Sequence, residues 1–386
     1  MITTKTYKFR LDPTRQQEQE FLRFAGCRRF VWNWALARKQ AVYKETGKTL
    51  GYNALASELV ALKKQPETAF FKECHSQALQ QTLRDWDKAF VCFFEKRTKF
   101  PRFKSRKRTA HALRIPQNVT VVEDRVSVPK VGLGKARLHR QMQGTIKSAT
   151  IKQEPNGHWY VCFISHIELP DVEPVWDAPV GIDVGLESFF TLDNGEKVKP
   201  PKFYRKAERK LKRLQRAVSR SQKTSRRRCK RKKVLAVYHA RVRNQRNDWL
   251  HKISSKLISR YDTLCIEDWN LKGLVKTKLA KSFTDASLGA FVRMLVDKAE
   301  WNRCRIVKVD RFFPSSQTCH PCNHRQHLEL SDRQWTCGGC GVIHDRDPNA
   351  AINLLLEGMR ILAVGSPESQ NDKGGNVRLA KVSSSR

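Results

Sequence analysis

Hydrophobic residues in the first hundred positions recur mainly every three or four residues, which is the period of an α-helix. An alternating stretch at residues 4–10 comes before them and predicts a short strand. Helical patterns then cover residues 13–43, with Gly26 as a candidate break, and residues 52–64 and 73–96. We predict a mostly helical region whose aromatic-rich faces form an ordinary core.

The pattern changes to alternation with period two between residues 111 and 167. Short β-type runs follow one another there, separated by turn residues such as the Pro-Asn-Gly at 155–157. Several short strands without a long helix predict a small β-barrel. The N-terminal strand can complete this barrel, and the helical region is then an insertion between its strands.

A basic and aromatic segment at residues 100–108, FPRFKSRKR, separates these two regions. Interleaved cations and aromatic rings are typical of a loop that follows phosphates and stacks bases. A basic linker whose two phenylalanines are anchored in a core explains the pattern equally well. Arg102 and Lys104 are the candidate nucleic-acid contacts of this segment.

Strand and helix patterns alternate in the second half of the chain. A linker is expected at residues 169–174, and a tail rich in Ser, Gly and Lys, expected to be disordered, begins at Gly365. Between them, strands are predicted at residues 180–185, 261–267 and 305–310, and helices at 234–259, 288–302 and 348–362. This alternation predicts an α/β domain.

Charge decides the class of partner. The chain has 386 residues and a formal net charge of +38, which indicates a polyanion such as a nucleic acid. Residues 202–233 alone hold 17 Lys or Arg and one Glu, and they predict one or two helices with a phosphate-facing surface. The candidate contacts are Arg205, Arg209, Arg213, Arg216 and Arg220.

Other classes are disfavoured. We find no run of about 18 apolar residues that would span a membrane, and no membrane partner is expected. The first ten residues, MITTKTYKFR, lack the apolar core of a secretion signal. Eleven cysteines without such a signal indicate a reducing compartment and free thiols instead of disulfides. We expect the cytoplasm of a prokaryote, with the protein on the nucleoid when it is bound to DNA.

Two Cys-x2-Cys pairs form the strongest local motif. Cys319 and Cys322 are followed, after fourteen residues, by Cys337 and Cys340. Two such turns complete a tetrahedral four-sulfur site for Zn²⁺, which is closed and hence structural. Nearby histidines are alternative ligands, although the site does not need them: His320, His324, His327 and His344.

Three acidic residues stand at the ends of predicted core elements. Asp183 lies on the first strand of the α/β region, Glu267 ends the second, and Asp347 precedes the last helix; Asp345 is an alternative to Asp347. Clustered carboxylates repel one another unless a cation is present. If these three converge, two Mg²⁺ ions would hold them and support phosphodiester hydrolysis.

The order of these motifs resembles that of the TnpB (transposon OrfB) family, which is similar to type V CRISPR effectors. It runs GIDVG, a basic helical region, IEDWNLKGL, FFPSSQTCHPC, CGGCG and DRDPNAAINLL. The opening YKFRLDPT and RRFVWNWAL and the later FPRFKSR extend the resemblance over about residues 5–360. One departure is Asn323, where the family usually has a glycine after the first cysteine pair.

The resemblance implies a multidomain α+β fold. Its implied parts are a β-barrel wedge domain (1–10 and 109–170) with an inserted helical recognition lobe (11–108), then an RNase H-like (RuvC) α/β nuclease domain (171–313 and 345–364) with an inserted zinc ribbon (314–344), and a disordered tail (365–386). Asp183, Glu267 and Asp347 match the first, second and third catalytic acids of the family.

The resemblance also implies a function. It is RNA-guided cleavage of double-stranded DNA beside a short adjacent motif, with a guide RNA from the transposon end. The alternative is an RNA-guided DNA-binding repressor without nuclease activity, which is disfavoured because all three matching positions are acidic. A DDE-type transposase is a weaker alternative, because it does not account for the motif order.

Overall fold

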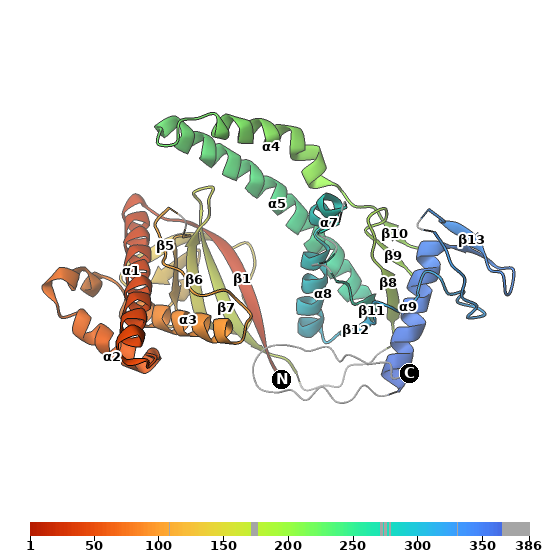
Figure 1. The fold of residues 1–386 in the computed structure, drawn as a ribbon, viewed down its shortest axis with the longest axis horizontal. Helices are drawn as coiled ribbons and strands as arrows, with labels where there is room; N and C mark the ends of the chain where they lie inside the picture. The colour runs from red at the N-terminus through yellow and green to blue at the C-terminus, as the bar shows by residue number, and fades with distance from the viewer. Residues whose placement is uncertain are drawn as a thin grey trace. The chain divides into compact units, whose positions relative to one another are not determined.

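The computed structural model describes residues 1–107, 109–170, 177–270, 273, 276–277, 279–329 and 331–364. Within them the chain forms two compact units (Figure 1). The first comprises Met1–Pro170 with Lys232–Val237, and the second comprises the described residues of Asp171–Arg231 and Tyr238–Arg386. The predicted disordered tail and most of the predicted linker at 169–174 lie outside the described residues.

An antiparallel seven-stranded sheet forms the base of the first unit, in the order β2-β6-β7-β1-β5-β4-β3. Its strands are β1 (Ile2–Asp12), β2 (Ala112–Ile115), β3 (Thr120–Val122), β4 (Arg125–Val128), β5 (Gly132–Arg137), β6 (Thr145–Gln153) and β7 (Trp159–Glu168). The N-terminal strand is central, as expected, because β1 pairs with both β7 and β5. The pairings among the described residues leave β2 and β3 as edges, so the sheet is an open half-barrel where the sequence predicted a small β-barrel.

The helices of this unit are inserted between β1 and β2. They are α1 (Arg15–Thr46), α2 (Tyr52–Leu62), a 3₁₀ segment η1 (Pro66–Glu73) and α3 (Ser76–Phe94). A capping box between Thr14 and Gln17 begins α1, which continues through Gly26 without the predicted break. The amphipathic faces of the helices pack on the sheet in one core that contains Phe9, Phe163 and Trp86.

The basic segment that follows α3 is attached to α1. The Trp32 indole donates to the carbonyl of Arg102 at 3.0 Å, and the Asn33 amide pairs with the backbone of Lys104 in both directions, at 2.9 and 2.7 Å. Phe100 packs edge-on against Phe90 and Phe93 of α3. One of the two phenylalanines is thus anchored, and the backbone at Arg102 and Lys104 is held against α1.

A second sheet, in the order β10-β9-β8-β11-β12, organises the other unit. Its strands are β8 (Pro179–Asp183), β9 (Phe190–Leu192), β10 (Lys197–Val198), β11 (Thr263–Glu267) and β12 (Arg305–Val309). The strands β8, β11 and β12 are mutually parallel, whereas β9 and β10 return antiparallel to β8. Its helices are α4 (Phe203–Ser219), α5 (Arg226–Arg260, apart from Lys232–Val237, which belong to the first unit), α7 (Ala280–Ala286), α8 (Leu288–Asn302) and α9 (Arg346–Ala363). A small hairpin of β13 (Gln334–Thr336) and β14 (Ile343–Asp345) leads into α9.

Helices cover the two faces of this sheet differently (Figure 1). Residues of β8 and β11 such as Ile182 and Ile266 pack in the core that α8 and the C-terminal part of α5 supply. The alternate residues face α9, as strand geometry requires. On that side a Cβ at Gly181 would collide with the carbonyl of Ala351, and α9 therefore lies almost in backbone contact with β8. None of the helices among the described residues is long and apolar enough to cross a membrane.

Candidate active site and metal centre

The topology brings two of the three predicted acids to one edge of the sheet. Asp183 is the last residue of β8 and Glu267 is the last residue of β11. The two strands are parallel neighbours with Gly181 opposite Cys265. Each acid lies two residues after one of these partners, so both side chains are on the face of the sheet that α9 covers. Asp347 lies in the first turn of α9. Its approach to the sheet is fixed by the close packing at Gly181.

The other two acids affect the pKa of Asp183. Burial, together with the negative charges of Asp347 and Glu267, raises the pKa of Asp183 to about 7, while Arg346 and the Val184 N–H act in the opposite direction. Burial also raises the pKa of Glu267, against a hydrogen bond from the Trp269 side chain. The negative charges of Asp347 and Glu267 therefore both act on the Asp183 carboxylate.

Two neighbouring cavities open at this edge. The first, of about 110 Å³, is lined by Asp183 and Asp347 together with polar side chains such as Ser188 and Thr191. The second, of about 450 Å³, is lined by Glu267 and is more apolar. Gly185 and Leu186 line both, so the acids border two adjoining cavities. The three carboxylates do not form a single close-packed ligand set among the described residues.

Asp345 and Asp347 have different surroundings. The Asp345 carboxylate is the N-cap of α9, accepting from the Asp347 N–H at 3.3 Å, and it pairs with Lys197 at 2.5 Å. The Asp347 carboxylate lies 3.6 Å from the guanidinium of Arg333, which also contacts Glu187 at 2.9 Å. Arg333 comes from the loop between the two cysteine pairs. It belongs to no sequence motif, so its contact with Asp347 could not be predicted from the sequence.

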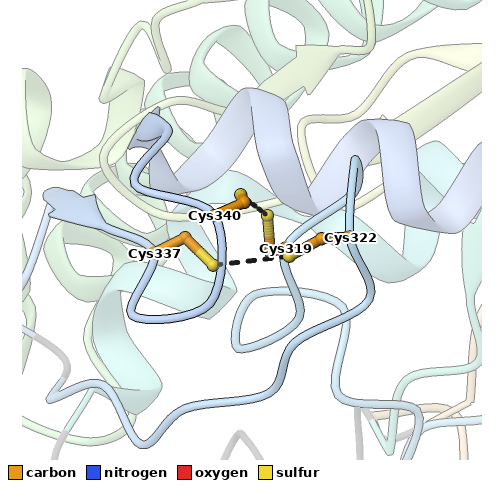
Figure 2. Close-up of side chains that lie close together, drawn as sticks. All are labelled: Cys319, Cys322, Cys337 and Cys340. Atoms are coloured by element: carbon orange, nitrogen blue, oxygen red, sulfur yellow. Dashed lines mark hydrogen bonds between the residues drawn. The ribbon is translucent and has the colours of Figure 1, made fainter.

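The four predicted cysteines form a compact cluster (Figure 2). All four sulfur atoms lie within 4.8 Å of one another, and the Cys319–Cys340 and Cys322–Cys337 pairs are each 3.6 Å apart. A tetrahedron with metal–sulfur bonds of about 2.3 Å has edges of about 3.8 Å, so the cluster fits zinc. Among the described histidines, His344 is close to the cluster, with its Nε2 3.1 Å from the Cys319 sulfur.

The two cysteine turns have the same backbone geometry. The N–H of Asn323 donates to the carbonyl of Cys319 at 2.8 Å, and Gly341 repeats this bond to Cys337 at 2.9 Å. Both residues have a left-handed backbone, with φ of 59° and 76°. Asparagine tolerates this conformation better than most side chains, which explains why it can replace the expected glycine.

Two buried asparagines attach the first cysteine turn to α9, a role that the sequence analysis missed. Asn349 donates to the carbonyl of Thr318 at 2.8 Å and accepts from the backbone N–H of His320 at 3.2 Å. Asn353, one helical turn later, donates to the carbonyls of Ser315 at 2.8 Å and Thr318 at 2.7 Å. The sequence signal was a pair of asparagines four residues apart on an otherwise apolar helix face.

The basic region forms a hairpin of two helices, α4 and α5. The five predicted contacts Arg205, Arg209, Arg213, Arg216 and Arg220 are exposed and recur every three or four residues, hence on one stripe of α4 and its C-cap. Arg102 is exposed as well, whereas the Lys104 amino group lies 3.1 Å from the Trp32 ring centre and burial lowers its pKa to about 8. Lys104 is therefore less available to a phosphate than expected.

Comparison with known proteins places the chain in a family. A sequence profile described as probable transposase (OrfB_IS605) matches residues 168–278, and one described as a Cas12f1-like TNB domain matches residues 289–354. A protein of Streptomyces pristinaespiralis is 35% identical over 96% of this chain and 94% of its own length, and InsQ of Escherichia coli K12 is 33% identical over 95% of each. The chain belongs to the TnpB/OrfB family. Both of these TnpB relatives carry the name "Putative RNA-guided DNA endonuclease".

Structure comparison agrees at the level of the fold. A chain from a Cas12f1–sgRNA–target DNA complex superposes with a TM-score of 0.52 at 13% sequence identity, covering 92% of this TnpB-family chain and 98% of the other. A third profile, described as a helix-turn-helix domain, matches residues 1–48. In this chain those residues form the strand β1 and the single helix α1.

Proposed function

We propose that this protein is an RNA-guided DNA endonuclease that cleaves target DNA beside a short adjacent motif. The observation that carries the proposal is the arrangement of Asp183, Glu267 and Asp347 around two adjoining cavities at the sheet edge. The match to relatives over nearly the whole chain, and their names, support the same activity. The function predicted from the motif order is thereby favoured over a repressor without nuclease activity.

The five-stranded sheet supports an RNase H-like (RuvC) assignment. Three antiparallel strands, β10-β9-β8, followed by two strands parallel to β8, are the arrangement expected for such a domain. The half-barrel and its inserted helices would then be the wedge domain and the recognition lobe, and the cysteine-bearing segment would be a zinc ribbon. In this division, residues 1–10 with 109–170, 11–108 and 314–344 keep the roles predicted for them.

The carboxylates fit a pair of Mg²⁺ ions. Their oxygens are hard ligands of the kind that Mg²⁺ prefers, and the mutual repulsion at Asp183 is relieved when a cation lies between the acids. Asp183, Glu267 and Asp347 would hold these ions, which would supply activation of a water molecule and stabilisation of the leaving oxygen. The protein's part is to hold Asp183, Glu267 and Asp347 on rigid elements. Trp269 positions the Glu267 carboxylate through its hydrogen bond.

The surroundings of the last acid support Asp347 over Asp345. The Asp347 charge acts on Asp183, whereas the Asp345 carboxylate is committed to the helix cap and to Lys197. The cysteine cluster would hold one Zn²⁺ as a structural ion, because four thiolates complete its coordination and leave no open position.

The arginine stripe of α4 is our candidate clamp for the backbone of the guide–target duplex. Replacing Arg213 by Ala should remove one phosphate contact and reduce the slope of log affinity against log salt by roughly 1. Lys104→Ala is the matched control, since its amino group already lies against Trp32 and the slope should hardly change. Equal slopes for wild type and Arg213→Ala would remove α4 from the interface.

The partners follow from the same proposal. They are a guide RNA from the transposon end and double-stranded target DNA, and the protein would act on the nucleoid in a prokaryotic cytoplasm.

The deciding test is cleavage by the complex purified with its own RNA, given Mg²⁺ and a DNA target that matches the guide. Asp183→Ala should abolish cleavage and leave binding intact, while Asp248→Ala, an exposed acid paired with Lys252, should cleave normally. Cleavage by Asp183→Ala at the wild-type rate would sink the proposal, and a wild-type complex that binds the target without cleaving it would favour the repressor.

A further inference from the structure

Phe312 is an exposed aromatic residue at the mouth of the candidate active site. Its side chain is 84% exposed, more than any other large hydrophobic residue that the structure describes. It lies in the turn after β12, and β12 is the parallel neighbour of β11, with Val309 opposite Glu267. Phe312 therefore stands at the same sheet edge as the catalytic acids. A single exposed phenylalanine is unremarkable elsewhere on a surface, but here it borders the chemistry.

The turn that carries Phe312 is fixed by hydrogen bonds. The Asp310 carboxylate accepts from the Phe312 N–H at 2.8 Å, and the Asp310 carbonyl accepts from the Phe313 N–H at 3.0 Å. The neighbouring Arg311 pairs with Asp268 at 2.9 Å. Asp268 is itself tied to β12 through its N–H to the carbonyl of Val309. The ring is thus presented by a rigid turn and not by a loose loop.

The depression beneath Phe312 has the lining of a base pocket. Its volume is about 450 Å³, and its walls include Trp269, Phe283, Leu186 and Phe312, with Glu267 at one side and Arg311 at another. The adjoining smaller cavity holds Asp183, Asp347 and hydroxyl side chains instead. The apolar, aromatic cavity suits the flat base of a nucleotide, and the polar, acidic cavity suits its sugar-phosphate through the cations that the acids would hold.

We propose that Phe312 and Trp269 hold, by stacking, the nucleobase next to the scissile phosphate of the DNA strand being cut. The proposal rests on the proposed nuclease function, because the acids define where the phosphate lies. The charge of Arg311 and the strongly basic chain favour a nucleic acid as the occupant. The site should not discriminate among the four bases, since every base offers a π-face to an aromatic ring.

The test combines removal of the ring with removal of the base. Guide-matched DNA targets carry a single abasic site, moved one position at a time across the cut site, and kcat/KM is measured for the purified RNA–protein complex. One abasic position beside the cut should slow the wild type roughly 10- to 100-fold, the range expected for one lost stacking contact. Phe312→Ala should slow intact DNA to the same degree and show no further loss at that position. Phe312→Tyr should restore both the rate and the sensitivity.

A binding measurement tests the stacking site without relying on DNA cleavage. In the Asp183→Ala background, 2-aminopurine at the sensitive position should be quenched, and the quenching should disappear with Phe312→Ala. Leu356→Ala is the matched control, an exposed apolar residue of α9 that does not line the cavity. If the abasic and Phe312→Ala effects multiply, or if no position near the cut is sensitive, the stacking site is wrong although the nuclease stands. A wild type that does not cleave at all overturns the proposed function itself.

Discussion

The cysteine cluster and the acid cluster are two candidate metal sites that are built in opposite ways. The cysteines come from one short segment, residues 319–340, and their sulfurs already lie within 4.8 Å of one another. The acids are spread along the sequence between residues 183 and 347, and each is carried by a different rigid element, two strands and a helix. A closed thiolate site suits a resident structural ion, whereas an open carboxylate site suits ions that take part in a reaction.

The largest expected effect separates the two acids that the sequence left as alternatives. Asp347→Ala should reduce cleavage by about 10³-fold or more, because on the proposed mechanism it would remove one of the carboxylates that hold Mg²⁺. The measurement is single-turnover cleavage of a guide-matched target at saturating Mg²⁺, with target binding measured in parallel.

Asp345→Ala is the matched control two residues away. It should cleave within a few-fold of wild type and lower the free energy of unfolding by about 1 kcal/mol, the typical cost of losing an N-cap side chain. The opposite pattern, with Asp345→Ala inactive and Asp347→Ala active, would show that we have assigned the third acid to the wrong residue.

The next test concerns the cysteine cluster. Cys337→Ser should lower bound zinc below one ion per chain and decrease the free energy of unfolding by at least about 3 kcal/mol, since metal binding and folding of such segments are coupled. Metal analysis by mass spectrometry and thermal unfolding give the two readouts. Cys229→Ser, an exposed cysteine outside the cluster, should change neither. Zinc content equal to wild type in Cys337→Ser would rule out the four-sulfur site.

The same contrast explains what the sequence could predict. Spacing alone identified the cysteines, because both turns are local and their geometry is repeated at Asn323 and Gly341. The acids were identifiable as strand and helix ends, and the resemblance ordered them. Their convergence needed the parallel pairing of β8 with β11 and the face shared by Asp183 and Glu267, which depends on register and not on local pattern.

Other features were beyond the sequence for physical reasons. The half-barrel remains open because closure depends on whether the distant strands β2 and β3 can pair, which no local alternation encodes. Arg333 meets Asp347 only through the tertiary placement of the loop between the cysteine pairs. The exposure of Phe312 was likewise hidden, because an aromatic residue after a strand is usually expected in a core.

A pH dependence should distinguish the acid site with and without metal. Because the pKa of Asp183 is about 7 in the fold against an ordinary 3.8, the folded state binds its proton more tightly. The stabilisation of the folded state by this proton is fully present below about pH 4 and is lost as the pH rises through 7.

In EDTA, Asp183→Asn should therefore be more stable than wild type at pH 8, by about 4 kcal/mol at most, and the difference should vanish toward pH 4. Mg²⁺ should reduce the difference at pH 8, because it binds only the wild-type carboxylates well. A difference that is constant with pH would mean that burial and the neighbouring carboxylates do not raise the pKa of Asp183.

The smallest expected effect tests whether the two sites are mechanically joined. Asn353 bonds the carbonyls of Ser315 and Thr318, and the Thr318 carbonyl also accepts from Asn349, so Asn353→Ala removes this donor from the buried Ser315 carbonyl at a cost of about 1–3 kcal/mol. If this attachment also orients α9, hydrogen exchange should increase in the first cysteine turn and cleavage should fall several-fold, while zinc content stays at one ion per chain. The comparison variant is Leu356→Ala, on the exposed side of the same helix, which should leave exchange in that turn unchanged. Normal cleavage with faster exchange would mean that the cysteine segment moves independently of the acids, and that the proximity of Arg333 to Asp347 contributes little to the reaction.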